Sequence, residues 1–506
     1  MTRRLTRRGA LAEMGAGAAA LWLGACGSTG SRVAAGDGST LHTTWGDPAG
    51  EGSLSVTGGM RLVDRTDLSP RVPVIGELAR VAHLTDAHVL DAQSPARVTF
   101  LDRLGAPYAS TFRPQEALTA AVLAGAVRAV NAFGPRAVIQ GGDLIDNAQS
   151  NELAQALRVL AGGRVGPASG AGGYVGVQSA ANADPFYYRP DVDAPHHPGL
   201  LAAAQAPFAS PGLQAPWYPV AGDHDLLVAG VVPSTPTTRA IALGDRAVWA
   251  LPRHLQVPRG FSVSVGQSPD GLANPAVINR LIGELLRQPS VTVPADPARR
   301  QLDVAEALGR LRSGSGRGGG SGPLLDYAFD VSRRVRVIVL DLVRRDGGSG
   351  GLVHPGQPRW LSDQLRSAGD RWVLVFSHQP LDTSQGGAEL LALLDRHPRT
   401  LAALWGHTHR TRIVARPAPN GGYWLIATAS LIDFPQQARA LRVLETAGGG
   451  AALETWMLDH VSDGRGGLGD IARSLAYLDA QGGRPQGSAG RALDRNVRLF
   501  RRSPVS

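Results

Sequence analysis

The chain of 506 residues contains no lysine, and its only cysteine is Cys26. The lack of lysine excludes a Walker-type phosphate-binding lysine, a pyridoxal Schiff base and a lysine nucleophile. A single cysteine excludes intramolecular disulfides, cysteine cages for zinc or iron–sulfur clusters, and thiol catalysis. The fold must therefore rely on its apolar core, which can be large at this length.

Signals for nucleic-acid binding are also missing, although the chain is basic. Its net charge is +9, and every basic residue apart from histidine is arginine. The arginines are spread along the chain and are not interleaved with aromatic residues, so we expect no specific nucleic-acid binding. The excess charge could attract anionic substrates or phospholipid head groups.

Five short polar motifs follow apolar runs in a fixed order. They are Asp86-Ala87-His88, Gly142-Asp143-Leu144-Ile145-Asp146-Asn147, Gly222-Asp223-His224-Asp225, Ser377-His378 and Gly406-His407-Thr408-His409. The runs before them are typical of buried strands, so each motif is expected on a loop at a strand end. A helix is predicted from about Pro114 to Phe133, closed by Gly134-Pro135. Strand, helix and strand with polar residues at the strand ends are typical of α/β sites.

With these motifs the chain resembles the calcineurin-like metallophosphoesterase superfamily. That family's pattern runs Asp-x-His, Gly-Asp-x-x-Asp, Gly-Asn-His-Asp/Glu, His and Gly-His-x-His. The resemblance spans roughly 76–460 and includes a Gln-x-x-Trp-Leu segment at 357–361. It implies an α/β (α+β) fold, a four-layer αββα sandwich of two mixed sheets with long loop insertions. Asp223 departs from the pattern, because the family has asparagine there.

The resemblance also implies a binuclear metal centre in which Asp143 bridges the two ions. One ion would be held by Asp86, His88, Asp143 and His409, and the other by Asp143, Asp223, His378 and His407. Alternate residues of an extended segment share a face, so both histidines of the last motif can point to one place. Iron, manganese and zinc all accept such ligands.

The implied activity is that of a metal-dependent phosphoesterase acting on a monoester or a diester. Attack by a metal-bound hydroxide would cleave the phosphate ester. His224 would protonate the departing oxygen and Asp225 would orient it. Asp146 occupies the position at which purple acid phosphatases carry a tyrosine ligand, so an iron–tyrosinate centre is not expected.

Two alternatives remain open. The first is a catalytically weak member of the same fold that binds metal or a phosphorylated ligand, because Asp223 adds negative charge beside the second ion. The second is a serine hydrolase, since Gly347-Gly348-Ser349-Gly350-Gly351 matches Gly-x-Ser-x-Gly. That motif requires a strand-to-helix turn, and no helical pattern follows this stretch directly.

The first 26 residues resemble a twin-arginine lipoprotein signal peptide. Arg7-Arg8 precedes the apolar stretch 11–25, which is too short for a stable membrane anchor. Leu23-Gly24-Ala25-Cys26 resembles a lipobox. We therefore expect export to the cell envelope and a lipid anchor on Cys26 at the outer face of the cytoplasmic membrane. A secreted or periplasmic protein is the alternative.

The remaining chain divides into three parts. Residues 27–75 are expected to form a tether with an edge strand or two, 76–460 the metallophosphoesterase domain, and 461–506 a Gly/Arg-rich tail. Two insertions, at about 162–216 and 226–324, leave the domain near expected ligand loops and are candidates for substrate recognition. The sequence gives no indication of the oligomeric state.

Replacing Cys26 by serine tests the expected anchor. Since only a thiol accepts the diacylglyceryl group, Cys26→Ser should move the protein from the membrane fraction to the soluble fraction or block its processing. Fractionation followed by mass spectrometry of the mature N-terminus measures this. An unmodified Cys26 in membrane-associated mature protein would contradict the expectation.

Overall fold

The structure is a computed structural model, and the described residues are 37–104, 111–250, 288, 290–316, 321–464, 467–482 and 488–504. The expected signal peptide, with Cys26, lies outside them. So does the part of the second insertion between 251 and 287.

A seven-stranded mixed sheet carries the first three motifs. Its strand order is β3-β19-β18-β17-β4-β5-β8. The neighbouring strands β4, β5 and β8, of which β8 is the edge strand, are parallel, so their carboxyl ends lie on the same side of the sheet, and β17 pairs antiparallel with β4. The strands are β3 (Val63–Arg65), β4 (Val74–Leu84), β5 (Ala137–Gln140), β8 (Trp217–Pro219), β17 (Gln437–Thr446), β18 (Ala451–Asp459) and β19 (Val497–Arg501).

A six-stranded mixed sheet carries the last two motifs. Its order is β11-β12-β13-β14-β16-β15, with parallel pairing from β12 to β16 and antiparallel strands at both edges. Every residue of β13 and β14 is buried, as expected for parallel strands covered on both faces. The strands are β11 (Tyr327–Ser332), β12 (Val335–Leu340), β13 (Trp372–Ser377), β14 (Thr400–Trp405), β15 (Arg412–Arg416) and β16 (Tyr423–Ala427).

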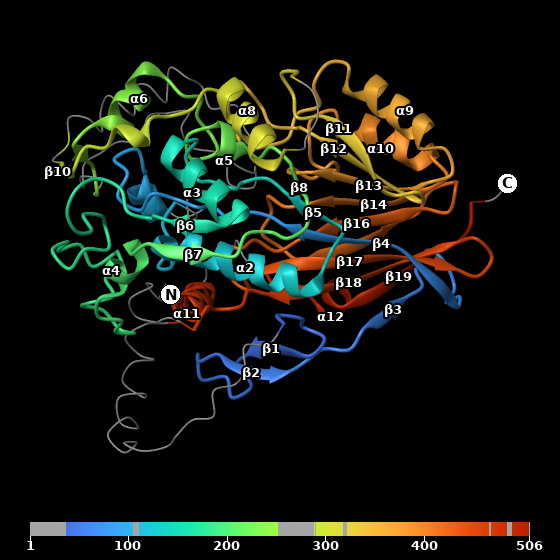
Figure 1. The fold of residues 1–506 in the computed structure, drawn as a ribbon, viewed down its shortest axis with the longest axis horizontal. Helices are drawn as coiled ribbons and strands as arrows, with labels where there is room; N and C mark the ends of the chain where they lie inside the picture. The colour runs from blue at the N-terminus through green and yellow to red at the C-terminus, as the bar shows by residue number, and fades with distance from the viewer. Residues whose placement is uncertain are drawn as a thin grey trace, which may run out of the picture.

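The two sheets pack against each other and helices cover their outer faces (Figure 1). Side chains from both sheets, such as Leu441 of β17 and Phe376 of β13, belong to one buried core. On the seven-stranded side, α2 contacts β17 and β18, and α9 packs on β13 of the other sheet. These layers confirm the expected αββα sandwich. The main helices are α2 (Thr119–Phe133), α3 (Ser150–Ala161), α9 (Gln357–Ala368), α10 (Gly387–Arg396) and α11 (Leu468–Gln481).

The predicted helix before the second motif is present as η2 (Glu116–Leu118) followed by α2. It ends at Gly134, whose φ of 65° lets its N–H bond the carbonyls of Val130 and Asn131. Among the described residues, only the stretch Glu116–Phe133 is a helix long and apolar enough to cross a membrane. Sixty-seven per cent of that stretch is buried inside the protein, the pattern of a core helix.

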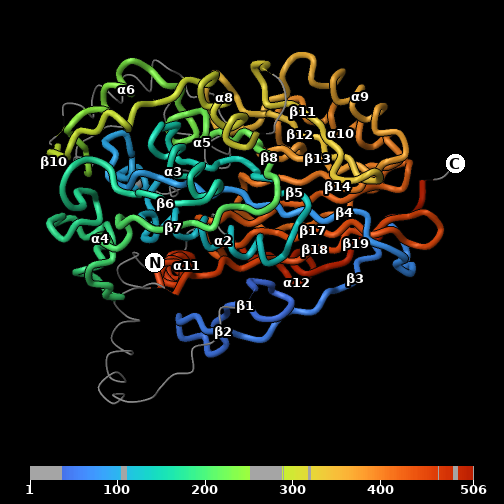
Figure 2. Tube along the Cα trace, in the orientation of Figure 1, coloured from blue at the N-terminus to red at the C-terminus, as the bar shows by residue number. Residues whose placement is uncertain are grey.

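Apart from α8, the described elements of the two insertions are short, and Figure 2 shows α4 and α6 toward the same end of the molecule. The first insertion contains β6 (Gly163–Val165), α4 (Leu200–Gln205) and β7 (Phe208–Ser210). The second, which follows α5 (Asp223–Leu226), contains α6 (Pro236–Leu243), β9 (Arg246–Ala247), β10 (Val291–Thr292), η3 (Pro297–Arg299) and α8 (Val304–Ser315). A further short helix, η1 (Thr99–Leu104), follows the first motif.

The expectation of a tail after residue 460 is wrong. This segment forms α11, α12 (Ala492–Arg495) and β19, and β19 lies between β18 and β3 inside the large sheet. Val497 and Leu499 of β19 are buried in the core. Arginines between these apolar residues concealed the strand in the sequence. The described part of the expected tether contains β3, an edge strand of the large sheet, as expected, and a separate hairpin of β1 (Thr43–Gly46) and β2 (Ser55–Gly58).

Candidate metal centre

All five motifs lie at carboxyl ends of strands, as the apolar runs predicted. The seven-stranded sheet contributes Asp86 and His88 after β4, Asp143 after β5 and Asp223 after β8. The six-stranded sheet contributes His378 after β13, and His407 and His409 after β14. Because the sheets face each other, these ends converge on one place between them.

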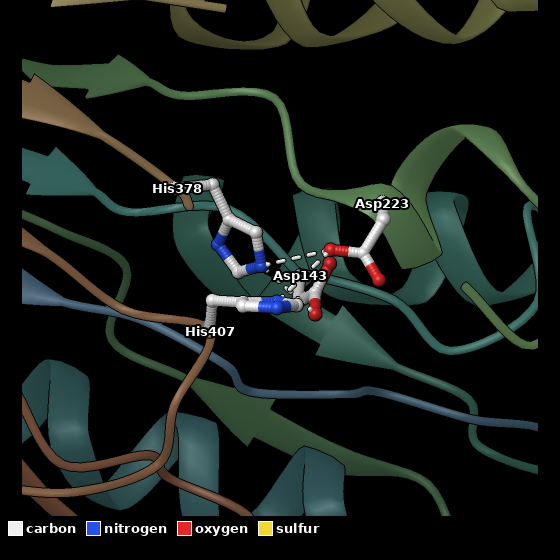
Figure 3. Close-up of side chains that lie close together, drawn as sticks. All are labelled: Asp143, Asp223, His378 and His407. Atoms are coloured by element: carbon white, nitrogen blue, oxygen red, sulfur yellow. Dashed lines mark ion pairs between the residues drawn. The ribbon is translucent and has the colours of Figure 1, made fainter. Parts of the chain in front are cut away.

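The seven expected ligands form two groups, in each of which one candidate ligand atom per residue lies within 4.8 Å of the others. The groups are Asp143, Asp223, His378 and His407, and Asp86, His88 and His409. Figure 3 shows the first four side chains directed toward one another from separate elements. In that group His378 Nε2 lies 3.2 Å from Asp223 Oδ1. In the second, His409 Nε2 lies 3.2 Å from Asp86 Oδ1.

Asp143 lies between the two groups. Its Oδ2 atom is 3.1 Å from His378 Nε2 and 3.6 Å from His88 Nε2. Its Oδ1 atom accepts a hydrogen bond from the backbone N–H of His224 at 2.9 Å. One oxygen thus faces both groups while the other is fixed by the loop after β8, which is the position that a bridging ligand requires.

Backbone conformation marks the same residues. Five of the seven have a positive φ, with values of 54° for Asp86, 43° for His88, 48° for Asp143, 58° for His407 and 54° for His409. Such angles are uncommon outside glycine and persist only where surrounding structure enforces them. The strained positions are concentrated at this cluster, where they aim side chains inward from sharp turns.

Glycines next to the motifs allow the loops to approach closely. A Cβ atom on Gly222 would lie 2.1 Å from the backbone nitrogen of Asp143. A Cβ atom on Gly406 would lie 2.1 Å from Thr85 Oγ1 and 2.4 Å from Asp86 Oδ2. Neither distance is tolerable, so the glycines permit the loops from the separate strands to meet.

The histidine rings are held so that one nitrogen faces the cluster. Three of them bond through Nδ1: His88 to Asp146 at 2.9 Å, His378 to the Gly141 carbonyl at 2.8 Å, and His409 to Asp433 at 2.6 Å. The Nε2 atoms of His88 and His378 are buried and have no hydrogen-bond partner. Unpartnered imidazole nitrogens beside carboxylates are the donor set that a borderline cation prefers, so the residues fit a metal.

The electrostatics favour positive charge within the cluster. Burial lowers the pKa of His378, but Asp143 and Asp223 outweigh it and hold the pKa well above its ordinary value. Burial raises the pKa of Asp223, but His407 and His378 hold it well below its ordinary value. The Asp223 carboxylate therefore stays ionised in a buried place and attracts cationic groups.

The structure corrects the expected role of Asp225. His224 bonds through Nδ1 to the backbone carbonyl of Asp146 at 2.7 Å, and its Nδ1 lies 3.4 Å from Asp146 Oδ1. The Asp225 carboxylate instead accepts backbone N–H groups of Leu144 at 2.9 Å, Ile145 at 3.1 Å and Gly222 at 3.0 Å. In the first turn of α5 its side chain reaches the loop after β5 and shapes it. Asp146 orients His224.

Two polar neighbours of the cluster were missed in the sequence. Gln379 donates through Nε2 to Asp223 Oδ1 at 3.0 Å, and Asp433 accepts from His409. Gln379 directly follows His378, so its position was a usable signal. Asp433 lies 24 residues beyond His409 in a turn outside any motif, and nothing in the sequence marked it.

No protein-family model and no curated protein matches the chain. Among solved structures, a dimetal phosphatase from Danio rerio is similar over 76% of this chain and 99% of its own, with 13% identity and a TM-score of 0.36. The sulfate thiohydrolase SoxB of Thermus thermophilus, in complex with glycerol, is similar over 81% and 61%, with 14% identity and a TM-score of 0.28.

A 5'-nucleotidase from Staphylococcus aureus, described as putative and in complex with alpha-ketoglutarate, is similar over 31% of this chain and 33% of its own. The identity is 14% and the TM-score 0.20. With identities below 25% and TM-scores below 0.5, these likenesses carry no weight for function. The chemistry is argued from the side chains of the cluster.

Gly222→Ala tests whether close approach of the loops builds the cluster. The added methyl group would push the loop after β8 away from Asp143, so metal affinity should fall by about ten- to a hundredfold, the range for lost supporting contacts. Metal titration of the purified protein measures this. Gly166→Ala is the matched control, because a Cβ atom there meets nothing within 4 Å. Equal affinities in the two variants would contradict the interpretation.

Proposed function

We propose that the protein is a two-metal phosphoesterase of the calcineurin-like type, exported and anchored to the cell envelope through Cys26. The observation that carries this proposal is the convergence of seven carboxylate and imidazole side chains into two groups with Asp143 between them. Iron, manganese and zinc all suit this donor set. A phosphate ester is the proposed substrate, without specific nucleic-acid binding.

The bound cations would acidify a water molecule and neutralise the phosphoryl oxygens. The chain's own residues define the side from which substrate arrives. The side chains of Asp86 and His378 are fully buried, whereas those of His224 and His407 are 23% and 19% exposed. The cluster therefore opens to solvent beside these two histidines, and the phosphate ester would enter there.

His224 is the proposed general acid. Its Nδ1 is occupied by the Asp146 carbonyl, so Nε2 is the nitrogen left to give a proton to the departing oxygen. Burial lowers the pKa of His224, but the carboxylates of Asp143 and Asp146 raise it to about 10. In the metal-free site these carboxylates therefore favour the protonated ring.

The alternative of a weak, ligand-binding member rests on Asp223. The Gln379 amide donates to Asp223 Oδ1, the same oxygen that faces His378 and His407. This contact draws part of the carboxylate's negative charge toward the amide. The extra charge relative to asparagine is thus partly offset, which favours an active enzyme over the alternative.

The serine-hydrolase alternative loses support in the structure. Ser349 lies in an irregular segment between β12 and α9, and its backbone carbonyl accepts a hydrogen bond from Gln379. A nucleophile elbow needs a strand, a sharp turn and a helix in direct succession. The segment around Ser349 has no such succession.

A panel of aryl phosphate monoesters and diesters, assayed with iron, manganese and zinc, tests the proposed activity. We expect hydrolysis that disappears on chelation and returns when metal is restored. Activity that resists chelators would favour the serine hydrolase. Tight metal binding without turnover of any ester in the panel would favour the weak member.

Asp143→Asn should remove metal and activity together. The Asp143 carboxylate faces His378 of one group and His88 of the other, and a neutral amide cannot supply the bridging negative charge. Elemental analysis of the purified variant and its rate with the best ester from the panel measure the effect, and circular dichroism checks the fold. A variant with two metal equivalents and near-normal turnover would show that the site is assigned wrongly.

His224→Ala should keep both metals but slow hydrolysis by about a hundred- to ten-thousandfold, the usual effect of losing a general acid. The loss should shrink for esters with good leaving groups, because those oxygens depart without a proton. Rates across a series of leaving groups measure this. An equal loss for every leaving group would argue against proton transfer by His224.

A further inference from the structure

His409 is bound to a carboxylate that is itself held by an arginine. Its Nδ1 lies 2.6 Å from Asp433 Oδ2. Arg113 then reaches the same carboxylate with Nε at 2.6 Å from Oδ1 and Nη2 at 3.1 Å from Oδ2. The side chains of Arg113 and Asp433 are only 5% and 3% exposed, and that of His409 is 8% exposed. The forked contact fixes the plane of the carboxylate against the imidazole.

The turn that carries Asp433 is attached to the proposed metal site at a second point. The backbone N–H of Ile432 donates to the carbonyl oxygen of Asp86 at 3.1 Å. Gln115 donates through Nε2 to the Ile432 carbonyl at 3.0 Å, and the N–H of Asp433 bonds Ser430 Oγ. Two proposed ligands, Asp86 and His409, are thereby tied to one short turn.

The other inward-facing histidines have weaker support. His88 bonds Asp146, but this carboxylate accepts its second hydrogen bond from the neutral Asn147 amide and lies next to His224. His378 bonds only a backbone carbonyl through Nδ1. Of these three histidines, His409 is thus the one whose carboxylate partner is itself paired with an arginine.

We propose that Arg113 and Asp433 are positioning residues that make the cation position of Asp86, His88 and His409 the more firmly retained of the two. This proposal rests on the proposed metal centre. An ionised Asp433 keeps the proton on Nδ1 of His409, so the Nε2 lone pair faces Asp86 and gains basicity. Arg113 keeps Asp433 ionised and immobile. Both residues act through His409.

A burial argument supports a positional role for this pair. A buried ion pair contributes little net stability, because desolvation of both charges offsets their attraction. The second pair of this kind near the site, Arg299 and Asp91, has Nε at 2.8 Å from Oδ2 and side chains 0% and 3% exposed, yet Asp91 contacts no proposed ligand. The two pairs are alike in burial, but Arg299 reaches Asp91 through Nε alone and bonds the Pro294 carbonyl and Ser169 Oγ with its other nitrogens. The forked Arg113 pair is the one that reaches a proposed ligand.

Release of zinc to a chelator tests the proposal. In the zinc-loaded wild type we expect one equivalent to leave quickly and the other slowly. Arg113→Lys and Asp433→Asn should accelerate the slow equivalent by about ten- to a hundredfold, as expected for a lost supporting contact. The fast equivalent should be unchanged. Arg299→Lys, the matched control, should release zinc as the wild type does.

The imidazole nitrogens give a second readout, independent of activity. In the zinc-loaded wild type, nitrogen NMR should show His409 protonated at Nδ1, and this signal should weaken in Asp433→Asn. If Asp433→Asn fails to fold because the buried Arg113 loses this counterion, the double variant Arg113→Met/Asp433→Asn removes both charges. The double variant should still release the slow equivalent faster.

Three outcomes would overturn the proposal. Zinc release in both single variants that matches Arg299→Lys would do so while leaving the phosphoesterase function intact. Release of the slow zinc equivalent from the double variant at the wild-type rate would also overturn the proposal and leave the phosphoesterase function intact. A wild-type protein that binds no zinc, iron or manganese would overturn the proposed function, and this proposal with it.

Discussion

The site depends on one carboxylate held between two sheets. Asp143 Oδ1 is fixed by the backbone of His224, so Oδ2 faces both His88 from the large sheet and His378 from the smaller one. Charges buried this deeply are tolerated only when opposite charges or cations surround them. The αββα packing is therefore what brings the two halves of the centre together, and neither sheet supplies both groups by itself.

Much of the fold and of the cluster could be predicted because the signals were local. Apolar runs ending in Asp or His placed Asp86 and His378 at strand ends, and the pairing of the strands then fixed their convergence. Features that depend on distant contacts were not predictable. The partner of His409 is Asp433 in an unmarked turn, and the direction of Asp225 depends on backbone groups of a loop 80 residues away.

The C-terminal strand shows how composition can mislead. Gly- and Arg-rich sequence usually indicates a solvated tail, yet the arginines of β19 find carboxylate or carbonyl partners. Arg498 bonds Glu454, while Arg501, buried at 2% exposure, donates to the carbonyl of Pro398. With those charges satisfied, Val497 and Leu499 can enter the core. Whether residues 497–501 form a strand or a solvated tail thus depends on hydrogen-bond partners that lie far away in the sequence. A short window of sequence does not contain those partners.

The position of β19 has a consequence for biosynthesis. It fills the place between β18 and β3, and within the described part of the chain β3 pairs with no other strand. While residues 497–501 are still inside the ribosome, β18 has an open edge and β3 has nowhere to dock. Open edges invite pairing with other chains, so a nascent or truncated chain would be prone to aggregation. Completion of the sheet by β19 therefore covers the edge of β18 and gives β3 its partner.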